Sequence, residues 1–185
     1  MKYCSACGQA VAYRVPSGDD RERYVCDHCD TIHYQNPRVV TGCLVTWEDR
    51  VLLCKRAIAP RRGFWTLPAG FLENGESTEA GAVRETWEEA RADVILDDLY
   101  TLFSLPHISQ IYMFYRARLE RRAFAAGDES QAVELFREAD VPWDELAFPV
   151  VKETLEHFFH DRRRKDFRIR TRTLVVDPAR RRGWG

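Results

Sequence analysis

The sequence predicts an α/β protein in which a mixed β-sheet packs against helices, preceded by a small separate module. Three observations predict this class: paired cysteines near the start, several runs rich in Val, Leu and aromatic residues, and two segments with helical spacing of apolar residues. We expect strands at 38–46, 50–56, 64–70, 93–104, 110–120 and 132–136. We expect helices at 77–91 and 150–159, and turns at 48–49 and 141–145.

The composition fits one main domain with a small addition. The chain has 185 residues, of which 45% are hydrophobic, so it can bury a core. Its formal net charge of −1 gives no overall attraction to nucleic acid or membrane. No apolar run is long enough to cross a bilayer, and the first residues lack the apolar stretch of a signal peptide. We expect a soluble, cytoplasmic protein with no membrane partner.

Four of the six cysteines form two pairs, Cys4-x-x-Cys7 and Cys26-x-x-Cys29. This spacing is typical of a zinc ribbon, in which four thiolates bind Zn²⁺ tetrahedrally and leave no open position for chemistry. We therefore expect a structural zinc ion that supplies much of the stability of this short segment. The alternatives are two disulfides or a redox-active Cys-x-x-Cys motif. His28 could replace one thiolate, although the four cysteines already complete the set.

The other two cysteines, Cys43 and Cys54, lie in apolar runs, where a buried, inert thiol is the common interpretation. We divide the chain into residues 1–36, 37–160 and 161–185. The last segment is strongly basic and can steer a polyanionic substrate or bind RNA, but such runs are more often simply solvated. Residues 173–176 within it could instead add a strand to a sheet edge.

Glutamates gather on one helix. Glu85, Glu88 and Glu89 stand at i, i+3 and i+4, so they share one helical face, where like charges repel unless a cation neutralises them. Carboxylate oxygens suit Mg²⁺ or Mn²⁺, which bind phosphorylated substrates as well. The opposite face is apolar and is expected to pack on the sheet through Ala80, Val83, Trp87 and Ala90. Ser77 or Thr78 is a candidate N-cap, and the helix is expected to end near Arg91.

The spacing of these acids with two upstream residues resembles a known motif. Gly70, Glu76, Arg84-Glu85 and Glu88-Glu89 follow the spacing of the Nudix box of pyrophosphate hydrolases. The chain departs from the family pattern at Thr86 and Ala92, where aliphatic residues are usual, and at Arg91, where glycine is usual. The competing interpretation is a solvent-facing helix in which Arg84 merely pairs with Glu88.

The resemblance implies an α/β/α sandwich over residues 37–160. It implies that the ligands of catalytic Mg²⁺ or Mn²⁺ are Glu85, Glu88 and Glu89, with Glu76 assisting, and that Arg84 orients a carboxylate. The general base is either a glutamate of the box or an acid on a later loop, for which the candidates are Glu129 and Glu134. Dinucleotide-cleaving Nudix enzymes are often homodimers, so a dimer is also expected.

The N-terminal half resembles zinc-ribbon Nudix pyrophosphatases, which implies FAD or ADP-ribose as substrate and AMP as product. NADH is the alternative, although the Ser-Gln-Pro-Trp-Pro-Phe-Pro stretch of NADH-cleaving members is replaced by Ser104-Leu-Pro-His107. Expected substrate contacts are Arg56, Phe71 and His107. A second function class remains open, a non-hydrolytic module that binds a nucleotide or RNA, but such modules usually lose box carboxylates and this chain keeps them.

Overall fold

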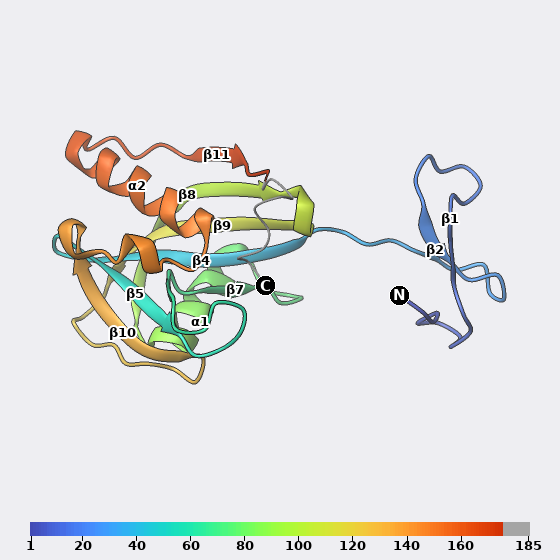
Figure 1. Ribbon diagram of the computed structural model, residues 1–185, viewed down its shortest axis with the longest axis horizontal. Helices are drawn as coiled ribbons and strands as arrows, with labels where there is room; N and C mark the ends of the chain where they lie inside the picture. Colours follow the sequence, from blue (N-terminus) through green and yellow to red (C-terminus); the bar gives the residue numbers. More distant parts are fainter. Residues whose placement is uncertain (176–185) are drawn as a thin grey trace. The chain divides into compact units, whose positions relative to one another are not determined.

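The computed structural model describes residues 1–175, which fall into two compact units (Figure 1). The first unit is Met1–Asn36, and the second begins at Pro37. The first holds three short antiparallel strands in the order β1 (Ala12–Arg14), β2 (Arg23–Val25) and β3 (Ile32–His33). No helix among residues 1–175 is long and apolar enough to cross a membrane.

The second unit is built on a mixed sheet with strand order β10-β5-β4-β9-β8-β11. β4 runs parallel to β9, β11 runs parallel to β8, and the other neighbours along this path are antiparallel. Two short strands, β6 and β7, pair with β5 and β4 respectively. The bounds are β4 Arg38–Trp47, β5 Arg50–Arg56, β6 Trp65–Thr66, β7 Ala69–Phe71, β8 Val94–Leu105, β9 Gln110–Leu119, β10 Ser130–Arg137 and β11 Arg170–Thr173.

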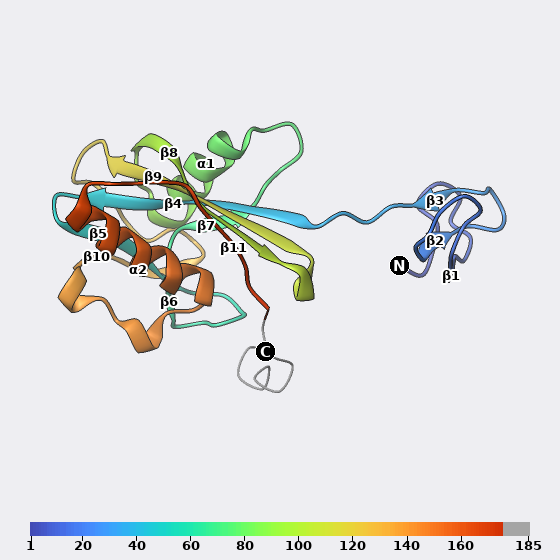
Figure 2. The same ribbon diagram turned by 90° about the horizontal axis from the view of Figure 1, so that it is seen from above.

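Two helices cover opposite faces of this sheet (Figure 2). α1 (Thr78–Ala90) packs through Ala82 and Ala90 on a cluster that includes the buried Cys43 and Cys54. α2 (Pro149–Arg164) packs on the larger cluster across the sheet. Short 3-10 helices occupy Pro106–Ile108 (η1), Glu138–Asp140 (η2) and Trp143–Glu145 (η3). The arrangement is the expected α/β/α sandwich, and both core cysteines are buried as predicted.

The ends of α1 agree with the prediction, but its buried face does not. Ser77 caps the helix by accepting a hydrogen bond from the Ala80 N–H at 3.2 Å, and Arg91 ends it in the left-handed conformation with φ 46°. Of the residues expected to pack on the sheet, Trp87 is 50% exposed and Ala80 is exposed too, whereas Ala90 is buried. The buried residues are instead Gly81, Ala82, Glu85, Thr86, Glu89 and Ala90. Small side chains let the helix approach the sheet closely, so part of the acidic face is turned inward.

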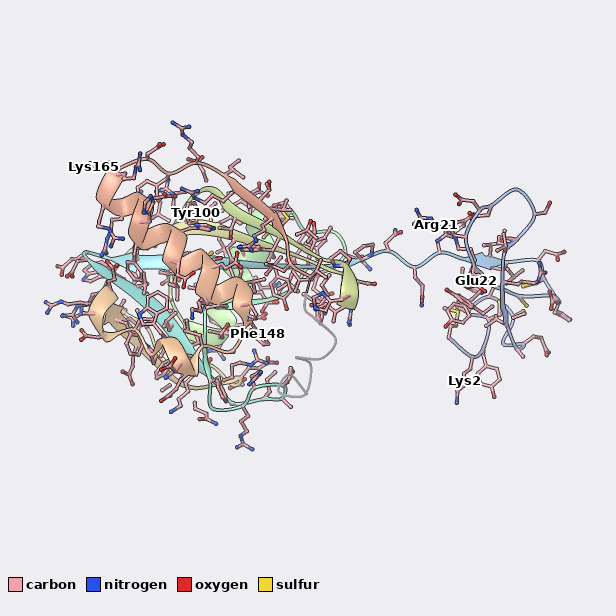
Figure 3. All side chains as sticks on the ribbon, turned by 45° about the horizontal axis from the view of Figure 1, so that its top comes forward. Lys2, Arg21, Glu22, Tyr100, Phe148 and Lys165 are labelled. Atoms are coloured by element: carbon pink, nitrogen blue, oxygen red, sulfur yellow. The ribbon has the colours of Figure 1, made fainter. Side chains whose placement is uncertain are left out.

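The expected C-terminal tail is partly ordered structure. α2 ends at Arg164, so the boundary we placed after residue 160 falls inside a helix. The chain then returns as β11, where Arg170 donates to the buried Asp161 through Nε at 2.8 Å. Tyr100 of β8, labelled in Figure 3, donates to the same carboxylate at 2.9 Å. Residues 176–185 of the basic segment lie outside the described residues.

Candidate active site

The acidic face of α1 lies directly against strand β7. A Cβ added at Gly70 would run into the carboxylate of Glu85, so this side chain packs on bare backbone. A Cβ at Gly81 would come within 2.9 Å of Glu76 Oε1, which brings Glu76 close to the same helix. The two glycines therefore allow two of the expected metal ligands to approach the backbone of the loop and helix.

Arg84 joins the glutamates to one another. Its guanidinium donates to both carboxylate oxygens of Glu76 at 2.7 and 3.0 Å, to Glu85 at 2.8 Å and to Glu88 at 3.1 Å. It also donates to the carbonyl of Phe71 in β7 at 3.2 Å. The hydrogen bonds from Arg84 lower the pKa of Glu76 to about 2. This geometry suits the role of holding carboxylates in fixed orientations.

Glu89 is the most enclosed acid of the site. The residue is 7% exposed, and one of its carboxylate oxygens accepts a hydrogen bond from the Ala69 N–H of β7 at 3.3 Å. Burial, reinforced by the charge of Glu85, raises the pKa of Glu89 to about 8. Burial also raises the pKa of Glu85, although Arg84 opposes the shift. Enclosure therefore opposes the ionisation of these two acids, and added positive charge would favour their carboxylate forms.

The donor set fits a divalent cation. Glu76, Glu85, Glu88 and Glu89 offer hard carboxylate oxygens, which is the chemistry that Mg²⁺ and Mn²⁺ require, and the buried pair would gain most from added positive charge. The glutamates are spread around Arg84. Among residues 1–175, only the four cysteines converge as a compact set of potential metal ligands.

The two candidate acids on the later loop, Glu129 and Glu134, lie in different surroundings. Glu129 lies in a turn that is attached to α1 through the Gly127 N–H, which donates to the Glu89 carbonyl at 3.0 Å, and its charge contributes to the raised pKa of both Glu85 and Glu89. Glu134 is an exposed residue within β10, opposite Leu53, and no described contact links it to the acidic face. Only Glu129 therefore joins the box glutamates.

The expected substrate contacts occupy different places. Arg56 lies at the end of β5, with its guanidinium 5.2 Å from the ring centre of Phe148, labelled in Figure 3, and its charge acts on Glu89. Phe71 is 44% exposed and lies beneath the guanidinium of Arg38 at 4.6 Å. His107 lies in η1, and its Nδ1 is buried without a hydrogen-bond partner. No described contact joins His107 to the acidic face.

Phe71 and Arg38 line a shallow cavity of about 300 Å³. Its walls come from the start of β4 and from the turn between β7 and α1, and comprise Pro37, Arg38, Val39, Phe71, Leu72, Glu73 and Asn74. The cavity lies beside the acidic site, because the N–H of Glu73, one of its lining residues, donates to Glu76 at 2.7 Å. Sequence reasoning missed Arg38, for which the only signal is a cation at the start of an apolar strand.

The four cysteines of the first unit form a compact cluster. All six cysteines of the chain are free thiols, which contradicts the disulfide alternative. The four sulfurs lie within 4.8 Å of one another, with Cys4 and Cys29 at 3.7 Å and Cys7 and Cys26 at 3.5 Å. Four Zn–S bonds of about 2.3 Å in a tetrahedron require sulfurs about 3.8 Å apart, so the cluster fits Zn²⁺. Sequence reasoning missed His33, whose Nε2 lies 3.3 Å from Cys4 Sγ.

Two family models cover almost the whole described chain. The model for the NUDIX domain matches residues 36–158. The chain belongs to the Nudix hydrolase family. A second model, described as Nudix N-terminal and covering the zinc ribbon, matches residues 2–35. The predicted family, its sandwich fold and its N-terminal zinc ribbon are therefore confirmed.

Among solved structures, a NUDIX hydrolase from Nitrosomonas europaea is 50% identical to this Nudix chain, with a TM-score of 0.89 over 94% of this chain and 100% of the other. An ADP-ribose pyrophosphatase of Methanocaldococcus jannaschii is 30% identical over 62% of this chain and 69% of its own. A NAD-capped RNA hydrolase NudC of Edwardsiella ictaluri is 28% identical over 75% of this chain and 50% of its own. The chain thus spans about half the length of this NudC relative, and 39% of the Nudix hydrolase YvcI of Bacillus subtilis.

Proposed function

We propose that this Nudix protein hydrolyses the pyrophosphate bond of a nucleoside diphosphate linked to a second moiety, with release of AMP. The observation that carries the proposal is the pair of enclosed acids, Glu85 and Glu89, which lie against β7 in surroundings that oppose their ionisation. Two such charges are costly to enclose unless a cation or a cation-bound ligand compensates them. A helix that only packs on the sheet gains nothing from two buried glutamates.

Each residue of the site then has a role in the reaction. Bound Mg²⁺ or Mn²⁺ would neutralise phosphate charge and make water nucleophilic. Its ligands would be Glu85, Glu88 and Glu89, with Glu76 assisting. Arg84 keeps the carboxylates in place through its hydrogen bonds to three of them. Glu129, the acid on the later loop, accepts the proton of the attacking water.

Three cations on β4 and β5 lie over aromatic rings and form no described ion pair. Arg38, Lys55 and Arg56 each lie over an aromatic ring, at 4.6, 5.6 and 5.2 Å from the ring centre respectively. Within residues 1–175, none of these three forms an ion pair. Their charge is therefore available to an anionic substrate, and the rings supply apolar surface for its organic parts. This supports a dinucleotide such as ADP-ribose or FAD, and the ADP-ribose pyrophosphatase among the relatives agrees with it.

A second candidate substrate is NADH or a related NAD-linked molecule. The NudC relative aligns over 139 residues, more of this chain than the ADP-ribose pyrophosphatase does, and it is named a NAD-capped RNA hydrolase. The absence of the Ser-Gln-Pro-Trp-Pro-Phe-Pro stretch argues for the first candidate. The non-hydrolytic nucleotide- or RNA-binding alternative is disfavoured, because every box carboxylate is present.

A substrate panel tests the proposal. Purified protein with Mg²⁺ or Mn²⁺ is given ADP-ribose, FAD, NADH, NAD and diadenosine polyphosphates, and AMP release is measured. We expect Glu88→Gln and Glu89→Gln to lower kcat by about 100-fold or more while far-UV circular dichroism stays unchanged. The matched control is Glu79→Gln, an exposed acid in the first turn of the same helix, which should keep wild-type rates. Metal-independent AMP release would contradict the proposal.

The preferred metal, the assembly and RNA binding stay predictions. Activity titrations with Mg²⁺ and Mn²⁺ compare the two ions, and light scattering reports whether the expected homodimer forms. An RNA role predicts that binding of an uncapped oligonucleotide weakens steeply with salt.

A further inference from the structure

The turn that follows β9 is fixed to the C-terminal end of α1 by backbone hydrogen bonds. The Ala125 N–H donates to the Ala90 carbonyl at 2.8 Å, and the Gly127 N–H donates to the Glu89 carbonyl at 3.0 Å. The last carbonyls of a helix have no partner within the helix, so the turn supplies donors that α1 needs. The turn therefore follows the position of the helix that carries the acidic site.

Gly127 allows this contact because it has no side chain. The residue is buried, and a Cβ added there would run into the Glu88 carbonyl oxygen. Its φ does not lie in the left-handed region, so its backbone conformation is open to alanine. Close approach to α1, and not backbone conformation, is therefore what requires glycine at this position.

The backbone of Glu129 attaches the turn to a second element, the segment that follows β5. Its carbonyl accepts a hydrogen bond from the Ala57 N–H at 2.8 Å, just beyond the end of β5, and the Ser130 N–H donates to the Gly127 carbonyl at 3.0 Å. The turn is thus attached to α1 at one end and to the segment after β5 at the other. Between these attachments, the Glu129 carboxylate lies near enough to Glu85 and Glu89 for its charge to act on both.

We propose that Gly127 is a positioning residue, which docks the 125–130 turn on α1 and so places the Glu129 carboxylate beside the box glutamates. The proposal rests on the proposed hydrolytic function, and it adds a residue outside the Nudix box to the machinery. A side chain at residue 127 would lift the turn from the helix and move Glu129 away from the water that it deprotonates. The binding of substrate, which uses other elements, would change little.

A double-mutant cycle tests this assignment. Gly127→Ala, Glu129→Gln and the double variant are compared with the wild type on whichever substrate the panel identifies. We expect Glu129→Gln to lower kcat about 100-fold or more, and Gly127→Ala to lower it about tenfold to 100-fold with KM within about twofold. In the Glu129→Gln background, Gly127→Ala should cost little further activity, because both changes remove the same contribution. The pH dependence of kcat should lose the same ionisation in both single variants.

Asp128→Ala is the matched control. It changes the neighbouring residue of the same turn, whose side chain is 99% exposed and, among residues 1–175, pairs with Arg91 at 3.7 Å. We expect wild-type kcat and KM from it, since nothing is inserted between the turn and α1. The melting temperature of each variant shows whether a lower rate comes from a displaced Glu129 or from an unfolded protein.

Each contrary result has a distinct meaning. Multiplicative losses in the double variant, or a rise in KM alone with Gly127→Ala, would refute the positioning role. Wild-type rates in Glu129→Gln would refute it as well, while leaving the proposed hydrolysis intact. Absence of hydrolysis from the wild type on every substrate would refute the proposed function itself. Should Gly127→Ala fail to fold, Ala125→Pro takes its place in the cycle, because proline removes the N–H that donates to Ala90.

Discussion

The Glu85 carboxylate lies against the backbone of Gly70, in the space that any side chain at residue 70 would occupy. This contact joins the β7 strand to the buried face of α1, and it sets the depth at which the acidic residues lie. Arg84 reinforces the junction, because it binds the Phe71 carbonyl next to Gly70 and the Glu85 carboxylate. The position of the acidic site therefore depends on a glycine in a strand as much as on the glutamates.

Gly70→Ala is expected to displace Glu85. The added methyl group cannot share space with the carboxylate, so either the side chain turns away or β7 moves from α1. A displacement of about 1 Å in an active site can cost about 100-fold in rate, and we expect a loss of kcat of that order. Steady-state kinetics with a thermal unfolding curve measure it. Wild-type kcat in a folded Gly70→Ala protein would show that Glu85 is not needed in its present position.

Arg84→Lys is expected to lose the bridging of the glutamates while keeping the positive charge. An ammonium group cannot bind both oxygens of Glu76 and also reach Glu85, Glu88 and the Phe71 carbonyl. We expect activity to fall about tenfold to 100-fold, as for other residues that orient metal ligands. The control is Arg91→Lys at the end of the same helix, where the arginine lies over Trp87 at 4.4 Å, and its activity should be unchanged.

The sequence predicted the zinc ribbon, the family and an N-cap of α1 at Ser77 or Thr78, because each of these depends on local spacing, and the family resemblance in turn implied the sandwich fold. It did not predict which face of α1 is buried. Hydrophobicity favoured Trp87, whereas the observed packing follows from the lack of side chains at Gly70 and Gly81. The contact between Gly127 and the Glu88 backbone could not be predicted from the sequence either, because contacts between segments far apart in sequence leave no periodic signal. An isolated glycine before two acids was the only indication.

Glu89 should make stability depend on pH in protein freed of divalent ions. The unfolded chain loses the Glu89 proton near pH 4.5, whereas the folded protein holds it until about pH 8. Between these values the folded state binds more protons, so the free energy of unfolding falls as pH rises. Each unit of separation corresponds to about 1.4 kcal/mol. Melting temperatures measured in chelator from pH 5 to 8 should decline for the wild type.

Glu89→Gln provides the comparison for this decline. Glutamine keeps the shape and the acceptor for the Ala69 N–H but has no proton to lose, so its melting temperature should depend less on pH. Above pH 8 the variant should be the more stable of the two, because it encloses no charge. Parallel curves for the two proteins would show that Glu89 ionises normally in the folded state.

His33 is expected to strengthen zinc binding by the ribbon. Its Nε2 lies 3.3 Å from Cys4 Sγ, where a donated N–H would offset part of the negative charge of four thiolates around one Zn²⁺. We expect His33→Ala to lose zinc to a colorimetric chelator at about tenfold lower chelator concentration than the wild type. His33→Gln, which keeps a donor, should lie between them. His28→Ala, at a position with no described contact to the cysteines, should match the wild type.

Arg170→Met is expected to destabilise the second unit, which begins at Pro37. Its guanidinium binds Asp161, a carboxylate that is 1% exposed and also accepts from Tyr100. Removing one partner leaves a buried charge, which typically costs about 3–5 kcal/mol. Burial disfavours the charge, but the bonds from Arg170 and Tyr100 hold the pKa of Asp161 below its usual range. This contribution to stability is therefore present at neutral pH and is lost as pH falls below the usual range of an aspartate.

Arg172→Met separates this effect from a general need for positive charge in β11. Arg172 lies two residues along the same strand and pairs with Glu153 at 3.0 Å, but its side chain is 62% exposed. A solvated pair of this kind contributes less than about 1 kcal/mol, so chemical denaturation should show a small loss, one that does not grow in acid. Similar losses from the two variants would mean that the strand, and not the buried carboxylate, determines the stability of this edge of the sheet. A large loss confined to Arg170→Met would show that β11 is held to the sheet chiefly through Asp161.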